Sequence, residues 1–185
     1  MAVTPAEAAR VLDEADLLYS AQDVTRALDG LGQRITARLQ DENPLILCVM
    51  TGGLVTAGRL LPRLLFPLQV DYLHASRYRG ETSGGHQVHW LAMPTTPLEG
   101  RAVLLVDDIL DEGYTLAAIQ AYCRENGAAS VSTAVLVEKH HDRRCADAEA
   151  EFIGLTVPDR YVFGCGMDYK EYWRNAPGIY AVKGM

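Results

Sequence analysis

The first forty residues carry apolar side chains every three or four positions, which is the spacing of one face of an α-helix. One such segment follows a Thr-Pro-Ala-Glu run at residues 4–7, where a capping residue, a proline and a glutamate stand at the positions they favour at a helix start. Its apolar series continues to Leu18, and a second segment begins near Asp23 and runs to Leu39. Residues 1–43 are therefore predicted to be a helical N-terminal segment.

From residue 44 onward the pattern changes to short, unbroken apolar runs that end at glycines or charged residues, as strands buried on both faces do. Helical spacing returns between some of these runs, at residues 54–65 and 116–125. Strands that alternate with helices imply right-handed crossovers between parallel strands. The predicted fold class is α/β, with a mainly parallel twisted sheet flanked by helices. The predicted strands are residues 44–50, 68–72, 86–93, 101–107, 131–137, 152–157 and, more weakly, 161–167 and 179–182.

The length and composition of the chain limit the number of domains and the kinds of molecule that it is expected to bind. A chain of 185 residues with 49% hydrophobic side chains has enough apolar material for one globular core, so we expect a single domain over residues 1–185. The formal net charge is −7 and no run rich in Lys or Arg is present, which argues against nucleic acid as a partner. No apolar stretch reaches the roughly 18 to 20 residues of a membrane span, and the first residues lack the pattern of a signal peptide.

The four cysteines are widely scattered and form no C-x-x-C pair. Cys48, Cys123 and Cys165 have apolar sequence neighbours, so we expect them to be buried thiols. This usage fits a reducing compartment, and the expected location is the cytoplasm.

The segment of residues 103–115, Val-Leu-Leu-Val-Asp-Asp-Ile-Leu-Asp-Glu-Gly-Tyr-Thr, carries the most chemical information. Ligands of open parallel sheets bind beyond the carboxyl ends of the strands, where this acidic turn lies. Backbone N–H groups of such a turn and the positive end of the following helix can hold a phosphate without any lysine, and Thr115 can donate a further hydrogen bond. Adjacent Asp107 and Asp108 can accept hydrogen bonds from ribose hydroxyls and help to hold Mg²⁺, while Asp111 lies nearer the reacting carbon of the sugar.

Taken singly, each of these residues is explained at least as well by an ordinary capped turn, and only the whole block favours a phosphate site. Neither G-x-x-x-x-G-K-[ST] nor a G-x-G-x-x-G after a strand is present. The block resembles the phosphoribosyl diphosphate signature of type I phosphoribosyltransferases, in their hypoxanthine-guanine branch. The similarity continues from Leu45 to Val182 and rests on several further motifs, which are the Met-Thr-Gly-Gly loop at 50–53, Ser-Arg-Tyr at 76–78, Val-Glu-Lys at 137–139, the segment 157–169 and Arg174.

The resemblance implies a role for each matching residue. Asp111 would accept a proton from the purine, while Asp107, Asp108, Glu112, Gly113, Tyr114 and Thr115 would bind ribose and its phosphate. Thr51, Gly52 and Arg174 would bind pyrophosphate, with a cis peptide expected at Thr51–Gly52, and Arg77 and Tyr78 would belong to a lid. Lys139, Tyr161, Val162 and Asp168 would bind the purine, with Lys139 on its exocyclic oxygen and Tyr161 stacked on its ring. The implied cofactor is Mg²⁺, held by Asp107, Asp108 and Asp168.

The implied activity is purine salvage, in which hypoxanthine or guanine reacts with phosphoribosyl diphosphate to give IMP or GMP and pyrophosphate. Residues 44–140 would be the core and residues 141–185 a hood over the base, with terminal segments contributing to it. Members of this family usually form dimers or tetramers, so we expect a homodimer or homotetramer. Two alternatives stay open: a preference for xanthine or adenine, of which Lys139 disfavours adenine because an amino group needs an acceptor, and a non-catalytic regulator that senses nucleotides.

Three residues depart from the commoner family pattern. Glu112 replaces a threonine, and its carboxylate would repel phosphate unless it points away. Arg77 replaces a serine, and Tyr114 replaces a lysine, which predicts a modest affinity for the donor. His140 and His141 fit no standard zinc spacing, so we expect an exposed pair in a loop.

Overall fold

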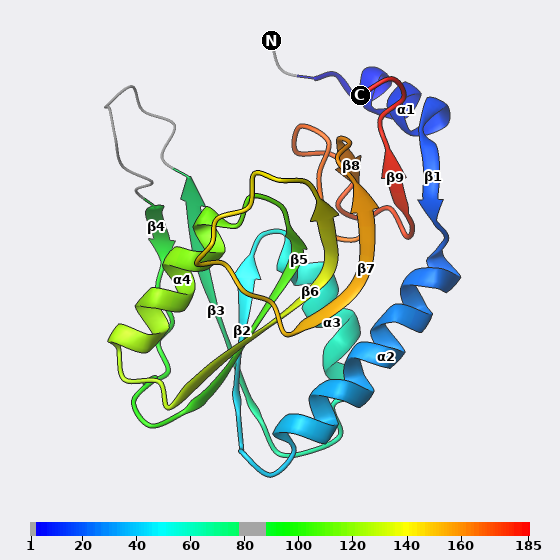
Figure 1. The fold of residues 1–185 in the computed structure, drawn as a ribbon. Coiled ribbons are helices and arrows are strands. Elements are labelled where there is room, and N and C mark those ends of the chain that lie inside the picture. The colour runs from blue at the N-terminus through cyan, green and yellow to red at the C-terminus, as the bar shows by residue number, and fades with distance from the viewer. Residues whose placement is uncertain (1–2, 78–87) are drawn as a thin grey trace.

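The computed structural model describes residues 3–77 and 88–185, except for the side chain of Arg77, and contains two sheets in that part of the chain (Figure 1). The larger has six strands in the order β4-β3-β2-β5-β6-β7. All neighbours are parallel except β4, which runs antiparallel to β3 at one edge. The predicted mainly parallel sheet is thus confirmed. Its strands are β2 (Leu45–Met50), β3 (Gln69–Arg77), β4 (Val88–Ala92), β5 (Ala102–Leu110), β6 (Ser130–His140) and β7 (Phe152–Pro158).

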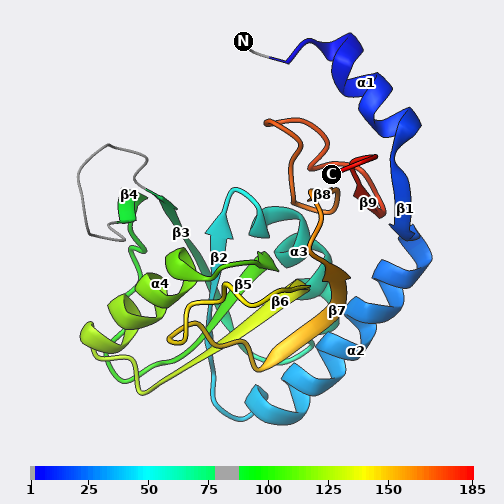
Figure 2. The same cartoon turned by 45° about the horizontal axis from the view of Figure 1, so that its top comes forward.

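Helices cover both faces of this sheet (Figure 2). Successive residues of a strand point to opposite faces, so Ile46 packs with α2 and α3 while its neighbour Leu47 packs with α4. Since both faces are buried, the strands read as unbroken apolar runs. The helices are α1 (Pro5–Glu14), α2 (Ala21–Leu39), α3 (Gly53–Leu60), the short 3₁₀ turn η1 (Leu61–Arg63) and α4 (Tyr114–Glu125).

The smaller sheet joins the two ends of the chain, in the order β1-β9-β8, with β1 (Asp16–Tyr19), β8 (Val162–Phe163) and β9 (Ile179–Ala181). It lies beyond the tips of β6 and β7, at the carboxyl edge of the large sheet (Figure 1). The prediction that the first helix continues to Leu18 is wrong, because the helix ends at Glu14 and Leu18 lies in β1. The strand pairs with residues 179–181, a partner that a local pattern cannot reveal.

The predicted strand at residues 161–167 is also only partly present. It shortens to the two residues of β8, and left-handed backbone conformations at Gly164, Cys165 and Gly166 turn the chain immediately afterwards. The prediction of buried thiols holds for Cys48, Cys123 and Cys165, and all four cysteines are free. Within residues 3–77 and 88–185, no helix combines the length and the hydropathy that a membrane span needs.

Candidate active site

The acidic turn begins inside β5, which extends through Leu110 rather than ending at the first carboxylate. Asp107 accepts the backbone N–H of Asp108, and Asp108 accepts that of Ile109, each at 2.8 Å. Asp108 is only 7% exposed. Burial raises the pKa of Asp107 well above its ordinary value, with the neighbouring charge of Asp108 adding to the effect, and burial raises the pKa of Asp108 as well. A bound cation would stabilise the ionised forms of both carboxylates.

The Met50–Thr51 loop closes over Asp108 from one side. The expected cis peptide at Thr51–Gly52 is wrong by one residue, because the cis bond joins Met50 and Thr51. A Cβ added to Gly52 would lie 2.5 Å from the carboxyl carbon of Asp108. Glycine at position 52 therefore permits a close approach between this loop and the acidic turn.

Gly52→Ala is expected to disrupt this approach and to lower stability by about 1–3 kcal/mol, the usual cost of forcing extra volume into a packed site. Chemical denaturation would measure the change. Gly58→Ala is the matched control, since a Cβ at Gly58 meets nothing within 4 Å in the same helical region. Equal stability of the two variants would contradict the proposed approach.

The N-terminus of α4 faces a second, smaller cavity of about 310 Å³, lined by residues 107, 109 and 111–116. Gly113 caps the helix with φ of 82°, and a Cβ there would lie 2.5 Å from that of Ala148. Gly113 has no side chain with which to cap the first backbone N–H groups of the helix. Backbone donors and a helix dipole directed into a small cavity fit a phosphate group, and Thr115 lines both this cavity and the larger one.

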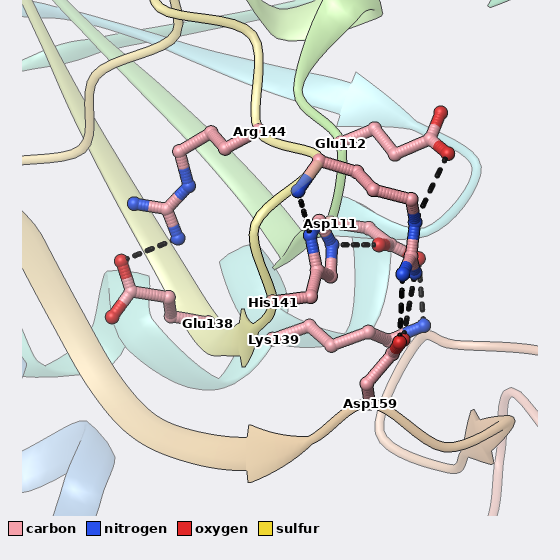
Figure 3. Close-up of polar contacts among 8 residues, drawn as sticks. Asp111, Glu112, Glu138, Lys139, His141, Arg144 and Asp159 are labelled. Carbon is pink, nitrogen blue, oxygen red and sulfur yellow. Dashed lines mark hydrogen bonds and ion pairs between the residues drawn. The ribbon is translucent and has the colours of Figure 1, made fainter.

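The Glu112 carboxylate lies near the guanidinium of Arg143, which offsets part of the repulsion that we expected between Glu112 and a bound phosphate. Its Oε1 lies 3.9 Å from Nε of Arg143, a long ion pair. Its carbonyl accepts the backbone N–H of Cys145 at 2.8 Å. Arg143 in turn forms two hydrogen bonds of 2.8 Å with Asp159, so the loop after β6 is tied to the end of β7 (Figure 3).

Asp111 lies between two donors on β6 and the loop that follows it (Figure 3). Nζ of Lys139 donates to its Oδ2 at 2.7 Å, and Nε2 of His141 lies 2.6 Å from its Oδ1. Burial alone would raise the pKa of Asp111, but these hydrogen bonds outweigh it and lower the pKa below its ordinary value. Asp111 is therefore held ionised, as a proton acceptor requires.

The prediction of an exposed histidine pair is wrong for His141. Its side chain is 2% exposed, whereas His140 is exposed. The two residues are adjacent, so only the fold decides which of them turns inward.

The far wall of the site comes from the end of β7 and the segment after β8. Tyr161 is 39% exposed and stands 5.6 Å from Tyr169 between ring centroids, and Val162 is buried. Nη2 of Arg174 lies 2.6 Å from Oδ1 of Asp168, and its Nη1 donates to the Gly166 carbonyl at 2.7 Å.

A cavity of about 870 Å³ connects these walls with the acidic turn. It brings together most of the residues selected from the sequence, namely Thr51, Gly52, Asp107, Asp108, Asp111, Thr115, Lys139, Tyr161, Val162, Asp168 and Arg174. Glu112, Gly113 and Tyr114 line the smaller cavity beside it. Of the expected lid, Arg77 ends β3, but its side chain and the whole of Tyr78 lie outside the described residues.

The donor set fits Mg²⁺ better than a transition metal. Asp107 and Asp108 offer oxygen ligands alone, and Mg²⁺ is usually bound by one or two carboxylates together with water and substrate phosphates. In the described part of the chain, no group of three or more His, Cys, Asp or Glu residues forms a self-sufficient metal site. A cation here would therefore depend on oxygens that a substrate brings.

Comparisons with known proteins agree with this chemistry. The family model described as "Phosphoribosyl transferase domain" matches residues 14–171. The chain is 33% identical over 167 residues to a hypoxanthine-guanine phosphoribosyltransferase of Bacillus subtilis, covering 90% of this chain and 92% of the relative. A counterpart from Streptococcus thermophilus is 32% identical over the same length.

Solved structures give the same result for the fold. A hypoxanthine phosphoribosyltransferase of Staphylococcus aureus superposes with a TM-score of 0.87 at 28% identity, covering 93% of this chain and 94% of that one. A hypoxanthine-guanine-xanthine phosphoribosyltransferase superposes with a TM-score of 0.84 at 29% identity, covering 92% and 99%.

Proposed function

Because the chain belongs to the phosphoribosyltransferase family, we propose that it is a purine salvage enzyme that converts hypoxanthine and guanine, with 5-phosphoribosyl 1-diphosphate, to IMP and GMP with release of pyrophosphate. The observation that carries the proposal is the Asp111–Lys139 pair at the cavity wall, beside the Asp107–Asp108 pair and a second cavity at the N-terminus of α4. In the larger cavity, the wall that carries Tyr161 and Val162 suits a purine base, and the wall that carries Asp107 and Asp108 suits a sugar phosphate.

The donor binds to the acidic turn. Gly113 and Thr115 hold its 5′-phosphate at the helix N-terminus, and Asp107 and Asp108 accept hydrogen bonds from the ribose hydroxyls. Asp107, Asp108 and Asp168 would hold Mg²⁺ together with substrate oxygens, and the bound ion would neutralise charge on the pyrophosphate. Arg174 and the Thr51–Gly52 loop stabilise the same leaving group.

The purine binds against Tyr161 and Val162 with its exocyclic oxygen toward Lys139. The bond between C1′ of ribose and pyrophosphate breaks as N9 of the base attacks, with positive charge building on the sugar ring as in glycoside cleavage. Asp111 accepts the proton that leaves the imidazole ring of the purine. A cation at the exocyclic oxygen stabilises the negative charge that this transfer places on the base.

Incubation of the purified protein with the donor, Mg²⁺ and each of hypoxanthine, guanine, xanthine and adenine tests the function. We expect rapid formation of IMP and GMP and no AMP, because Lys139 donates where an amino group would also donate. The alternative is an enzyme that prefers xanthine. Xanthine is therefore one of the bases tested, since the chain is similar to an enzyme named for hypoxanthine, guanine and xanthine. Binding of nucleotide without any turnover would instead support the regulator.

We also propose that residues 1–185 act as one domain, with residues 44–140 as its core and residues 141–185 as a hood over the base, and that the enzyme works in the cytoplasm as a homodimer or homotetramer. Four free thiols support a reducing compartment. Exposed apolar residues on α3, β3 and the loop between them support self-association, and they are Leu54, Leu65, Val70 and Tyr72. Light scattering of the purified protein would give the assembly state.

A further inference from the structure

His141 lies at the active site but has no role in the proposed mechanism. It lies one residue beyond the end of β6, yet its side chain is 2% exposed and its Nε2 is 2.6 Å from Oδ1 of Asp111. The register of the sheet brings the two segments together, since Leu110 of β5 pairs with Glu138 of β6, and the next residues along each chain, Asp111 and Lys139, form a hydrogen bond of 2.7 Å.

The other ring nitrogen of His141 fixes the direction of this hydrogen bond. Nδ1 lies 3.0 Å from the backbone nitrogen of Arg143, whose N–H can only donate. Nδ1 must therefore keep its lone pair, and the ring proton is on Nε2. His141 thus donates to Asp111 through Nε2 and accepts the backbone N–H of Arg143 through Nδ1.

The loop that carries this N–H is itself anchored on both sides. The two hydrogen bonds from Arg143 to Asp159 tie it to the end of β7, and an ion pair of 2.7 Å joins Arg144 to Glu138 on β6 (Figure 3). His141 has little freedom to rotate, because it is buried and bonded at both nitrogens.

The second donor to Asp111 is different in kind. Lys139 has a flexible four-carbon stem, and in the proposed function its ammonium also serves the exocyclic oxygen of the purine. When Lys139 turns to the purine, Oδ2 of Asp111 loses its partner, while Oδ1 keeps the one that His141 supplies.

We propose that His141 is a positioning residue for Asp111: it holds Oδ1 so that Oδ2, released by Lys139, faces the imidazole nitrogen of the purine. The inference rests on the proposed function. During transfer N9 forms its bond to C1′, pyrophosphate leaves with the electrons of its bond, and the purine proton passes to Oδ2. His141 keeps its own proton throughout.

His141→Ala should lower kcat by about 10- to 100-fold, the effect of one hydrogen bond to a charged group, with KM for the donor nearly unchanged. His141→Gln can place an amide N–H near the position of Nε2 and should recover part of the loss. The acidic limb of the kcat profile should move to higher pH in His141→Ala, because a carboxylate that loses a donor has a higher pKa. Lys139 and His141 lower the pKa of Asp111 through hydrogen bonds and charge, the charge of Arg143 also interacts with Asp111, and the carboxylates of Asp107, Glu112 and Asp159 line the same cavities as Asp111.

His140→Ala is the matched control, since it removes the exposed neighbour, and it should retain wild-type kcat. Wild-type kcat and an unshifted acidic limb in His141→Ala, or no recovery in a folded His141→Gln, would overturn the inference. Should His141→Ala fail to fold, His141→Phe, which keeps a ring of similar size but has no N–H to donate, replaces it, and wild-type kcat with an unshifted acidic limb in that variant would overturn the inference. Absence of any turnover by the wild type would instead reject the proposed function, and the inference with it.

Discussion

Asp111→Asn is expected to lower kcat by about 10²- to 10⁴-fold, the usual contribution of a positioned proton acceptor. The amide keeps the size of the side chain but cannot take the purine proton. Asp111 lines the phosphate cavity as well, but Gly113, Thr115 and the Asp107–Asp108 pair hold the donor in the proposed function, so the KM for the donor should change much less than kcat. Initial rates with hypoxanthine at saturating donor and Mg²⁺ measure the effect.

Asp147→Asn is a suitable control for that experiment. Asp147 is an exposed carboxylate in the loop after β6 and does not line either cavity. The variant should turn over like the wild type. If Asp111→Asn also does so, Asp111 is not the proton acceptor.

Asp107→Asn should separate activity from stability. Removing one ligand of the sugar and its cation is expected to raise KM for the donor by about 10- to 100-fold, the effect of a lost hydrogen bond to a charged group. Burial raises the pKa of Asp107 in the folded chain, so its ionised form disfavours the metal-free fold. The protonated form of Asp107 stabilises the fold at low pH, and this contribution to stability is lost as pH rises through the folded-state pKa. Without metal at neutral pH, the variant should therefore melt at the same temperature as the wild type or higher.

Asp71→Asn should show the opposite behaviour, which makes it an informative control. Burial would raise the pKa of Asp71, but hydrogen bonds from Thr96, Tyr72 and Thr95 outweigh it and lower the pKa to about 2. Its ionised form stabilises the fold above the unfolded-state pKa, and the contribution is lost as pH falls through the lower folded-state value. Asp71→Asn should melt at a lower temperature and keep its donor KM. A lower melting temperature for metal-free Asp107→Asn would contradict the account of the acidic pair.

The sequence was sufficient to predict the large sheet, because each of its central strands is buried on both faces and appears as an unbroken apolar run. It also identified the acidic turn, where β5 meets α4 and most of the selected side chains line one of the two cavities. The central strands and the acidic turn depend on local pattern or on one contiguous motif, whereas residues of the other walls, such as Lys139 and Arg174, were selected through the resemblance to the family.

Features created by distant segments could not be predicted in the same way. Leu18 follows a helix with a compatible apolar spacing, and its place in β1 depends on pairing with residues near 180. The inward orientation of His141 depends on how β5 and β6 are aligned and on the Arg143–Asp159 contact across the site. His140, the adjacent histidine, is exposed, so residue type alone could not predict which of the two side chains turns inward.

The proposed function depends on one property of the acidic turn, from Asp107 in β5 to Thr115 in α4, which is that it holds a phosphorylated ribose together with Mg²⁺. Isothermal titration of the purified chain with 5-phosphoribosyl 1-diphosphate, with and without Mg²⁺, tests it most directly. We expect saturable binding at one site per chain in the presence of Mg²⁺, and much weaker binding after the metal is chelated. Absence of binding with Mg²⁺ present, or equal affinity with and without the metal, would contradict it.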